Sequence, residues 1–426
     1  MSPNYVVRWS TGVTPHFVLT SGWQRSTEPC VISHLLLAAL VMDDLPASGS
    51  ARSPSAPQWP PLNPRLLPKV QRPCGRDEKP PMLANNSLFI KRFSIKGMIG
   101  QGGYGQIYQA RDTVTKQDVA IKIEPKVRRE RVAKRMMLEQ RVLIELKGKP
   151  HAPYLIASGH QEQINYFVLQ LLSVNLSDLK KMSPHKRLSK STVGRIMEQG
   201  ISALREIHRA GYVHRDVKPG NICFGVTPAS QRRLILLDFG LVRRYLNEDG
   251  TLRTPRENCG FRGTVRYVSV RVHKHMEQAP CDDLVSMFYT GLELLLSDLP
   301  WKTKKHTREI KRMKEEIGKI DFVQFQEAIG DVFTDFGRMI YLLQGDDEPD
   351  YDLLIRALHD MRKPHRLYDP YDWDNGWVDV EEWAPGAAPT AAHPPVPARS
   401  SRARIDSAKA ASSPPIGSRV VSALAG

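Results

Sequence analysis

The chain has 426 residues, enough for one large domain or two ordinary ones, and 41% of them are apolar, enough for a sizeable core. Lys and Arg outnumber Asp and Glu by 61 − 45 = 16, which favours acidic partners such as nucleotides or phosphorylated proteins. Basic residues do not form a compact run with aromatics between them, so we expect no nucleic acid partner. The five cysteines are scattered without a CxxC pair, which argues against a disulfide framework or a zinc site and favours a reducing compartment.

The longest apolar run, "VISHLLLAALVM" at 31–42, is too short to span a bilayer. As a secretory leader it would need an unusually long leading segment and a cleavage site beyond Asp43 and Asp44. We therefore expect no membrane association and a monomeric protein in the cytoplasm, with the nucleus as the alternative location.

Composition divides the chain into three regions. Residues 1–86 show little periodicity and include the Pro-rich stretch "SAPQWPPLNPRLLPKVQRP", which predicts a disordered or low-order extension. Residues 376–426 include the Ala-, Pro- and Ser-rich run "APGAAPTAAHPPVPARSS", which predicts a flexible tail. Residues 87–375 carry hydrophobic periodicity and form the candidate folded domain.

Within that region, a sheet pattern precedes a helical one. Short alternating segments between about 88 and 124 ("FSIKGMIG", "QIYQAR", "DVAIKIE") predict antiparallel strands, and residues 128–147 predict an amphipathic helix. "INYFVLQLL" is a further strand candidate. Helical patterns follow in "TVGRIMEQGISALREIHRAG", "CDDLVSMFYTGLELLLS" and "YDLLIRALHDMRK". The fold class is thus α+β, with a small sheet lobe at about 90–172 and a larger, mainly helical lobe at about 173–375.

The first candidate site is the glycine-rich stretch "IGQGGYGQI", with Gly100, Gly102 and Gly105 in GxGxxG spacing. A dinucleotide-binding fold needs a helix directly after the glycines, but here the strand pattern "QIYQAR" follows. Strand–loop–strand glycines suit a flap over nucleotide phosphates, because no side chain keeps the backbone N–H groups away. Ordinary turn glycines are the alternative.

Lys122 ends the strand segment "VAIK", and Glu139 lies in the middle of the helix predicted after it. Either residue alone suits a solvated surface. As an ordered pair they suit a cation for nucleotide phosphates that is held in place by an anion.

The third candidate is "HRDVKPGN", followed by "LILLDFG". A solvated charged turn is the alternative for the first stretch. Asp238, at the end of a strand pattern, and Asn221 supply oxygen ligands of the kind that Mg²⁺ shares with phosphates. Asp216 then remains free to orient a hydroxyl nucleophile and accept its proton, and Lys218 can steady the transferred phosphoryl group.

These motifs, together and in this order, resemble those of a protein kinase over about residues 90–375. The resemblance implies a bilobal kinase fold, ATP and Mg²⁺ as cofactors, and protein substrates; Lys218 in HRDxK implies Ser/Thr specificity. Ser269, Val270 and Arg271 stand in place of the usual Ala-Pro-Glu, and the chain looks like the casein kinase I group. "FRGTVRY", "DDLVSMFY", "LPWK" and "YDWD" look most like the tau-tubulin kinases within it.

The resemblance also assigns roles to further residues. Thr264 would tie the substrate-binding segment to Asp216 and Lys218, and Asp283 would brace the catalytic loop. Backbone groups of Gln170 and Leu172 would bind the adenine, with Leu169 as gatekeeper. For the apolar members of this set, core packing explains the residue type equally well. The implied ATP-binding set comprises Ile99, Gly100, Gln101, Gly102, Gly103, Tyr104, Gly105, Ile107, Ala120, Lys122, Gln170, Leu172 and Cys223.

Four arginines crowd the predicted activation segment: Arg253, Arg256, Arg262 and Arg266. They form either a solvated charged loop or an anion pocket for acidic or already phosphorylated substrates. The casein kinase I resemblance favours the pocket, with Arg266 as the best single candidate. Val285 replaces the Trp usual in tau-tubulin kinases and Val268 replaces an Ala, two packing changes that bear on substrate choice.

The sequence therefore predicts an ATP-dependent protein serine/threonine kinase. The alternative is a catalytically weak kinase-like scaffold that binds partners through its basic face. The intact set of Lys122, Asp216, Asn221 and Asp238 argues against it, since a scaffold has no physical need for that set. The substrate and any autophosphorylation do not follow from the sequence.

Overall fold

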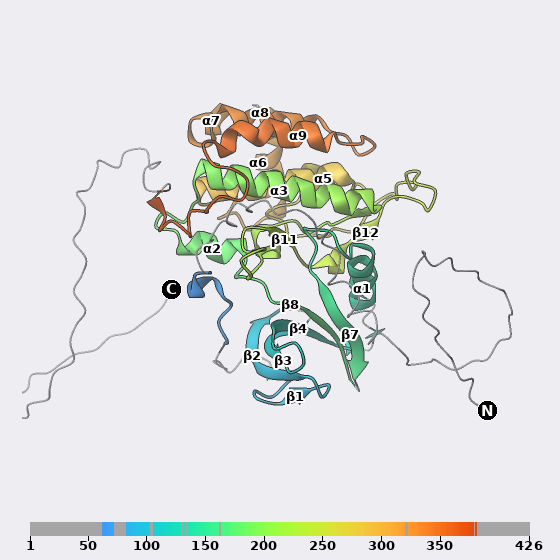
Figure 1. The fold of residues 1–426 in the computed structure, drawn as a ribbon. Coiled ribbons are helices and arrows are strands. Elements are labelled where there is room, and N and C mark those ends of the chain that lie inside the picture. Colours follow the sequence, from blue (N-terminus) through green and yellow to red (C-terminus); the bar gives the residue numbers. More distant parts are fainter. Residues whose placement is uncertain are drawn as a thin grey trace, which may run out of the picture. The chain divides into compact units, whose positions relative to one another are not determined.

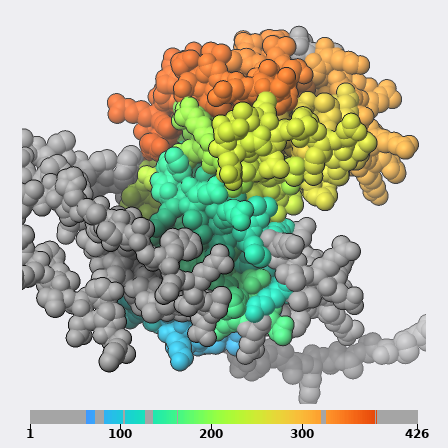
Figure 2. All heavy atoms as spheres, turned by 90° about the vertical axis from the view of Figure 1, so that its right-hand side faces the viewer, coloured from blue at the N-terminus to red at the C-terminus, as the bar shows by residue number. Residues whose placement is uncertain are grey.

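The computed structural model describes residues 62–71, 82–102, 105–128, 131–132, 135–161, 163–319, 323–378 and 380. Most of these residues form two lobes, a sheet lobe and a helical lobe, joined by the chain that follows Gln170 (Figure 1). Figure 2 shows the sheet lobe in blue and teal at one end and the yellow to orange helical lobe at the other.

The sheet lobe is an antiparallel sheet of strand order β1-β2-β3-β4-β8-β7. Along β3 buried residues alternate with more exposed ones, the period expected when one face of a sheet covers a core. Helix α1 follows the small β5–β6 pair and packs beside β7 and the start of the segment after Asp238. The elements are β1 (Leu88–Phe89), β2 (Phe93–Gln101), β3 (Gln106–Asp112), β4 (Asp118–Pro125), β5 (Val127–Arg128), β6 (Arg131–Val132), α1 (Arg135–Glu145), β7 (Leu155–Gln161) and β8 (Ile164–Gln170).

The helical lobe begins after β8, and its short strands carry the candidate catalytic residues. Its helices are α2 (Leu176–Met182), α3 (Lys190–Arg209), α4 (Val270–His273), α5 (Pro280–Leu296), α6 (Thr307–Lys319), α7 (Val323–Ile329), α8 (Asp331–Leu342) and α9 (Tyr351–Leu358). Its strands are β9 (Tyr212–Val213), β10 (Ile222–Phe224), β11 (Leu234–Leu236) and β12 (Arg243–Arg244). The 3₁₀ turns in the described part of the chain are η1 (Pro64–Leu66), η2 (Pro219–Asn221), η3 (Phe239–Leu241) and η4 (His359–Arg362).

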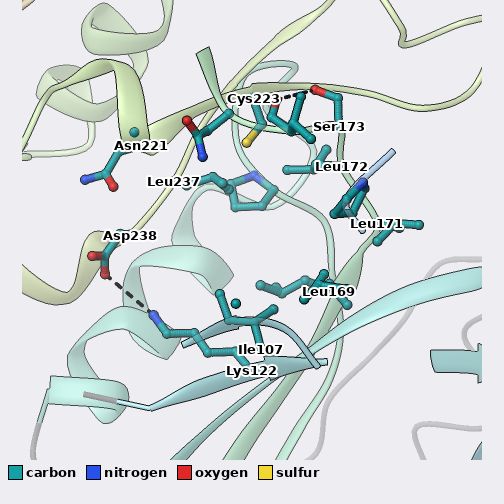
Figure 3. A pocket seen from close by; sticks show the side chains of 18 of the residues that line it. Ile107, Lys122, Leu169, Leu171, Leu172, Ser173, Asn221, Cys223, Leu237 and Asp238 are labelled. Carbon is teal, nitrogen blue, oxygen red and sulfur yellow. Dashed lines mark hydrogen bonds and ion pairs between the residues drawn. The ribbon is translucent and has the colours of Figure 1, made fainter. Parts of the chain in front are cut away.

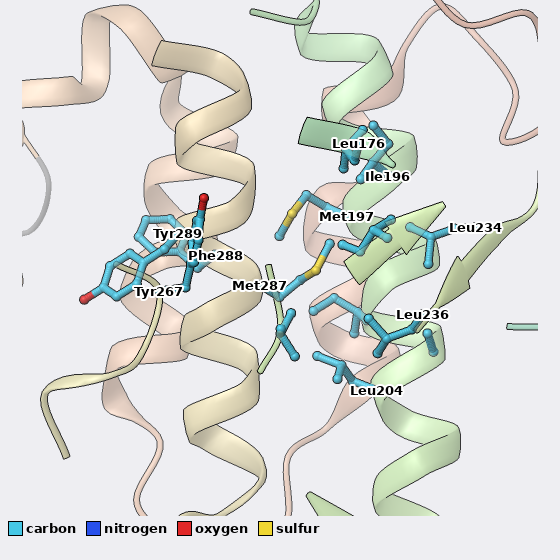
Figure 4. Packing of buried hydrophobic residues seen from close by; sticks show 14 of the residues in the cluster. Leu176, Ile196, Met197, Leu204, Leu234, Leu236, Tyr267, Met287, Phe288 and Tyr289 are labelled. Atoms are coloured by element: carbon cyan, nitrogen blue, oxygen red, sulfur yellow. The ribbon is translucent and has the colours of Figure 1, made fainter. Parts of the chain in front are cut away.

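The core of the helical lobe lies between α3 and α5, which cross closely because each has a glycine where the other places a methionine (Figure 4). A Cβ on Gly200 would lie 2.2 Å from the methyl group of Met287, and a Cβ on Gly291 would lie 2.7 Å from the sulfur of Met197. An alanine at either position would force the facing methionine to move, because interiors are close-packed. This packing fixes α5, and with it Asp283, beneath the catalytic loop.

The α+β, bilobal fold predicted from the sequence is confirmed. The helix predicted over residues 128–147 is shorter, since α1 begins at Arg135. Residues 62–71, which we call the N-terminal segment, lie within the extension that was predicted to have low order. They nevertheless contain η1 and bury Leu66. At the other end, Val380 is buried, so packing continues past the predicted boundary at 375.

Candidate active site

A pocket of about 780 Å³ opens between the two lobes. It brings together residues predicted from separate stretches: Ile99, Gly100, Gly102, Gly105, Ile107, Ala120, Lys122, Glu139, Leu169, Gln170, Leu172, Asn221, Cys223 and Asp238. Gln101 is not among the residues that line it. Gly103 and Tyr104 lie outside the described residues.

The inner end of this pocket is lined by apolar side chains. Ile107 and Leu169 approach from the sheet, and Leu172, Cys223 and Leu237 approach from the opposite side (Figure 3). Burial raises the pKa of the Cys223 thiol to about 12, so it is a neutral, apolar surface rather than a reactive group. The predicted adenine contacts of Gln170 and Leu172 lie at this end and stay a prediction.

The glycine-rich turn between β2 and β3 closes tightly. The Gly102 N–H donates to the Gly105 carbonyl over 2.9 Å. A Cβ on Gly105 would lie 2.0 Å from the Ile123 carbonyl oxygen, so only glycine lets this turn approach β4 so closely. Among the described residues, a Cβ on Gly102 would meet nothing within 4 Å.

Lys122 on β4 reaches Glu139 on α1, as predicted. Its ammonium lies 2.7 Å from both carboxylate oxygens of Glu139 and 3.5 Å from Asp238 Oδ1. Burial lowers the pKa of Lys122, but the carboxylates of Glu139 and Asp238 outweigh it and raise the pKa overall. The lysine is therefore a permanent cation directed into the pocket (Figure 3).

Asp238 follows β11 in the left-handed backbone region, with φ of +64°. Burial raises the pKa of its carboxyl, but the cations of Lys122 and Arg135 lower it well below its usual range. Arg135 donates to Asp238 Oδ1 over 2.5 Å from the first turn of α1. Sequence reasoning missed Arg135, because nothing in its spacing shows which side of α1 it occupies. A Cβ on Gly240 would lie 1.8 Å from the Arg135 side chain, so this glycine makes room for the contact.

Asp216, Lys218 and Thr264 form a triangle of hydrogen bonds. Lys218 Nζ donates to Asp216 Oδ2 over 2.7 Å and to Thr264 Oγ1 over 3.0 Å. The Thr264 hydroxyl in turn donates to Asp216 Oδ1 over 2.7 Å. The predicted tie between the substrate-side segment and the catalytic loop is thus present in the geometry.

The same loop is joined to the strand that carries Asp238. Asn221 Nδ2 donates to the Asp216 carbonyl over 2.8 Å, so its side-chain oxygen points elsewhere. The Leu237 N–H donates to the Asn221 carbonyl over 2.8 Å, which places Asp238 beside Asn221. His214 Nε2 lies 3.0 Å from the Leu237 carbonyl oxygen and adds a second link.

Asp283 braces the catalytic loop from α5, as the resemblance implied. Its carboxylate accepts from the backbone N–H groups of His214 over 2.6 Å and Arg215 over 2.8 Å. His208 Nε2 lies 3.0 Å from the same carboxylate. Arg215 has φ of +69°, a conformation unfavourable for a residue with a Cβ, so these bonds stabilise a turn that would otherwise relax.

The segment that follows Thr264 rests on Lys314, a second residue that sequence reasoning missed. The Lys314 side chain is 0% exposed, and its nitrogen donates to the Val265 carbonyl over 2.8 Å and the Val268 carbonyl over 2.6 Å. The nitrogen also lies 5.0 Å and 5.2 Å from the ring centres of Tyr289 and Trp301. A lysine in an amphipathic, charged helix gives no sign in the sequence that it faces inward.

The four predicted arginines differ in their partners. Arg256 pairs with Glu277 over 2.6 Å, and Arg266 is half-buried beside the Tyr267 hydroxyl. Arg253 and Arg262 are exposed, and neither forms an ion pair with a carboxylate among the described residues. Val268 and Val285 are both buried, in agreement with packing roles.

Comparison with known proteins gives the family. The protein kinase domain family matches residues 93–367. The chain belongs to the protein kinase family. A Caenorhabditis elegans relative named "Putative casein kinase I" is 47% identical over 298 residues, which are 69% of this chain and 87% of that relative. A "Probable serine/threonine-protein kinase" of Dictyostelium discoideum is 33% identical over 293 residues, 68% of this chain and 58% of that relative. A "Probable casein kinase I homolog" of Encephalitozoon cuniculi is 32% identical over 241 residues, 54% and 73% of the two chains.

The kinase is thus a protein serine/threonine kinase of casein kinase I type, as its motifs predicted. In place of Ala-Pro-Glu, Ser269 caps α4 and donates to Asp282 at the start of α5 over 2.5 Å. The closer resemblance to tau-tubulin kinases stays a prediction. Across the part of the kinase that the structure describes, we find no helix with both the length and the apolar character needed to cross a bilayer.

Proposed function

We propose that the kinase transfers the γ-phosphate of ATP, bound with Mg²⁺, to serine or threonine hydroxyls of acidic or already phosphorylated proteins. The observation that carries the catalytic part is that two groups of residues are joined through Asn221, which lines the pocket with Asp238 and donates to the Asp216 carbonyl. Lys122 lies between Glu139 and Asp238 on the phosphate side, and the Asp216–Lys218–Thr264 triangle faces the substrate side.

In this proposal Asp216 orients the substrate hydroxyl and accepts its proton. Hydrogen bonds from Lys218 and Thr264 hold its carboxylate in one orientation. Lys122 contacts the phosphates, and Lys218 offsets charge on the transferred group. The glycine-rich turn covers the phosphates with backbone N–H groups.

The residues present fit a magnesium ion. Lys122 and Arg135 both contact Oδ1 of Asp238, which leaves Oδ2 for a cation. Asn221 uses its side-chain nitrogen on Asp216, which leaves its amide oxygen. Carboxylate and amide oxygens are ligands that Mg²⁺ accepts, and bound Mg²⁺ bridges phosphate oxygens and offsets their charge.

The acidic or phosphorylated substrate is supported by the arginines after Asp238. Arg262 is exposed two residues before Thr264, and Arg266 lies two residues after it. An anionic group on a substrate bound at Asp216 would pass close to both, and guanidinium forks match phosphate oxygens. Arg266, the candidate from the resemblance, is half-buried, so Arg262 is the more accessible of the two.

Phosphate transfer from radiolabelled ATP to casein tests the catalytic part, with Asp216→Asn beside the wild type. Asp335→Asn, on the exposed side of α8, is the matched control. We expect labelling by the wild type and the control and its loss in Asp216→Asn. A wild type that binds ATP but labels neither casein nor phosphorylated peptides would favour the scaffold instead.

The substrate preference is tested by comparing Arg262→Ala and Arg266→Ala on paired peptides with and without a phosphoserine. The matched control is Arg312→Ala, an exposed arginine of α6. We expect the ratio of kcat/KM values for the two peptides to fall in one or both variants and not in the control. An unchanged ratio in both would remove the anion pocket from the proposal.

A further inference from the structure

The N-terminal segment is attached to both lobes. Leu66 is 3% exposed and belongs to the buried cluster of the helical lobe, and its carbonyl accepts from the Val174 N–H over 2.8 Å. The Gln71 N–H donates to the Met98 carbonyl of β2 over 2.7 Å. Figure 1 shows the blue segment running from beside α2 to β2. The chain between Leu66 and Gln71 therefore links the helical lobe to the strand that leads into the glycine-rich turn.

The contact with the sheet is a close one. A Cβ on Gly97 would lie 2.3 Å from Val70 Cγ1, so the segment approaches β2 where a side chain is missing. Gly97 also has φ of +153°, which favours glycine independently. Val70 occupies the space that a side chain at position 97 would take, so the segment contacts the sheet at a specific position.

Between its two attachments the segment borders the nucleotide pocket. Leu67 and Pro68 offer apolar surface there, and Arg65 and Lys69 offer positive charge at its mouth. An anionic nucleotide with an apolar base suits such a wall. The residues of the segment that line the pocket also lined by Lys122 and Asp238 are Arg65, Leu67, Pro68, Lys69 and Gln71.

The geometry assigns the N-terminal segment to the nucleotide site, as an outer wall that raises the affinity for ATP. This inference rests on the nucleotide pocket of the proposed function but lies outside the residues matched to the protein kinase domain, which begin at Phe93. Two effects contribute to the affinity. The segment covers part of the ligand surface, and by bonding to both Met98 and Val174 it restrains the position of β2 relative to the helical lobe. By linkage, bound nucleotide must stabilise the docked segment as much as the segment stabilises bound nucleotide.

The test uses the full-length kinase and two variants that release opposite ends of the segment. Leu66→Ser removes the anchor in the helical lobe, and Gln71→Pro removes the N–H that bonds to Met98. Leu342→Ser, at a leucine 76% exposed on α8, is the matched control. Isothermal titration with a non-hydrolysable ATP analogue gives the Kd, and trypsin cleavage after Arg65 and Lys69, with and without the analogue, reports release of the segment.

We expect both variants to raise the Kd roughly three- to tenfold, up to about 1.4 kcal/mol, with no change in the control. Cleavage should be faster in Leu66→Ser, and the analogue should slow it in the wild type. An unchanged Kd despite faster cleavage would overturn the assignment, as would cleavage of the wild type that nucleotide does not slow. A wild type that binds no nucleotide would instead refute the nucleotide pocket, and the proposed function with it.

Discussion

The hydroxyl of Thr264 is the part of the site whose removal gives the clearest result. It donates to Asp216 and accepts from Lys218, so one oxygen sets the position of both residues. Thr264→Val keeps the shape and deletes the oxygen. Hydrogen bonds to charged groups contribute about 1.5–3 kcal/mol each. If the loss of about one such bond falls on the transition state, kcat should drop roughly 10- to 100-fold.

The assay is steady-state kinetics on a serine peptide, with the free energy of unfolding measured beside it. Thr264→Ser is the matched control, because it keeps the hydroxyl and should retain most of the activity. KM for ATP should stay near the wild-type value, since Thr264 does not line the nucleotide pocket. Equal kcat values for Thr264→Val and Thr264→Ser would refute the reasoning.

Three further predictions concern the supports of the site. Asp283→Asn should lower the free energy of unfolding by about 3 kcal/mol or more, because an amide cannot accept from both backbone N–H groups and His208; a melting temperature within a degree or so of wild type would contradict this. Glu139→Gln should lower kcat/KM and destabilise the fold by up to about 3–5 kcal/mol, because it removes the closest carboxylate from a buried lysine; the matched Gln140→Glu, one position along α1, should keep the activity. Burial lowers the pKa of Lys314 from 10.5 in the unfolded chain to about 6 in the folded protein. Between these two pH values the lysine is protonated in the unfolded chain and neutral in the folded protein. The free energy of unfolding therefore falls as the pH falls through this range. Methionine does not titrate, so as the pH is lowered from 9 to 6.5 the melting temperature of Lys314→Met should rise relative to that of the wild type. Melting temperatures that change equally with pH in the two proteins would refute the assigned burial effect.

Some of the site is short-range in sequence, and there residue spacing predicted the geometry well. Asp216, Lys218 and Asn221 share one loop of six residues, so few arrangements are open to them. Lys122 and Glu139 are joined through β4 and α1, and the pairing of β3, β4 and β8 leaves little choice of where the lysine lies. The alternation along β3 and the helical periods of α3 and α5 gave the fold class for the same reason.

Other parts depended on how elements rotate and approach in three dimensions. Arg135 and Lys314 are ordinary helix cations in the sequence, and only the rotation of α1 and α6 directs them inward, to Asp238 and to the carbonyls after Thr264. Leu66 lies in a Pro-rich stretch that predicted low order, because a segment without its own periodicity shows no sign of docking on a distant surface. The sequence by itself determined which residues form the candidate catalytic loop and the family of the fold. The tertiary structure decided which residues surround that loop. Hydrophobic periodicity shows which face of a helix or strand is buried, but it does not show which other element that face packs against.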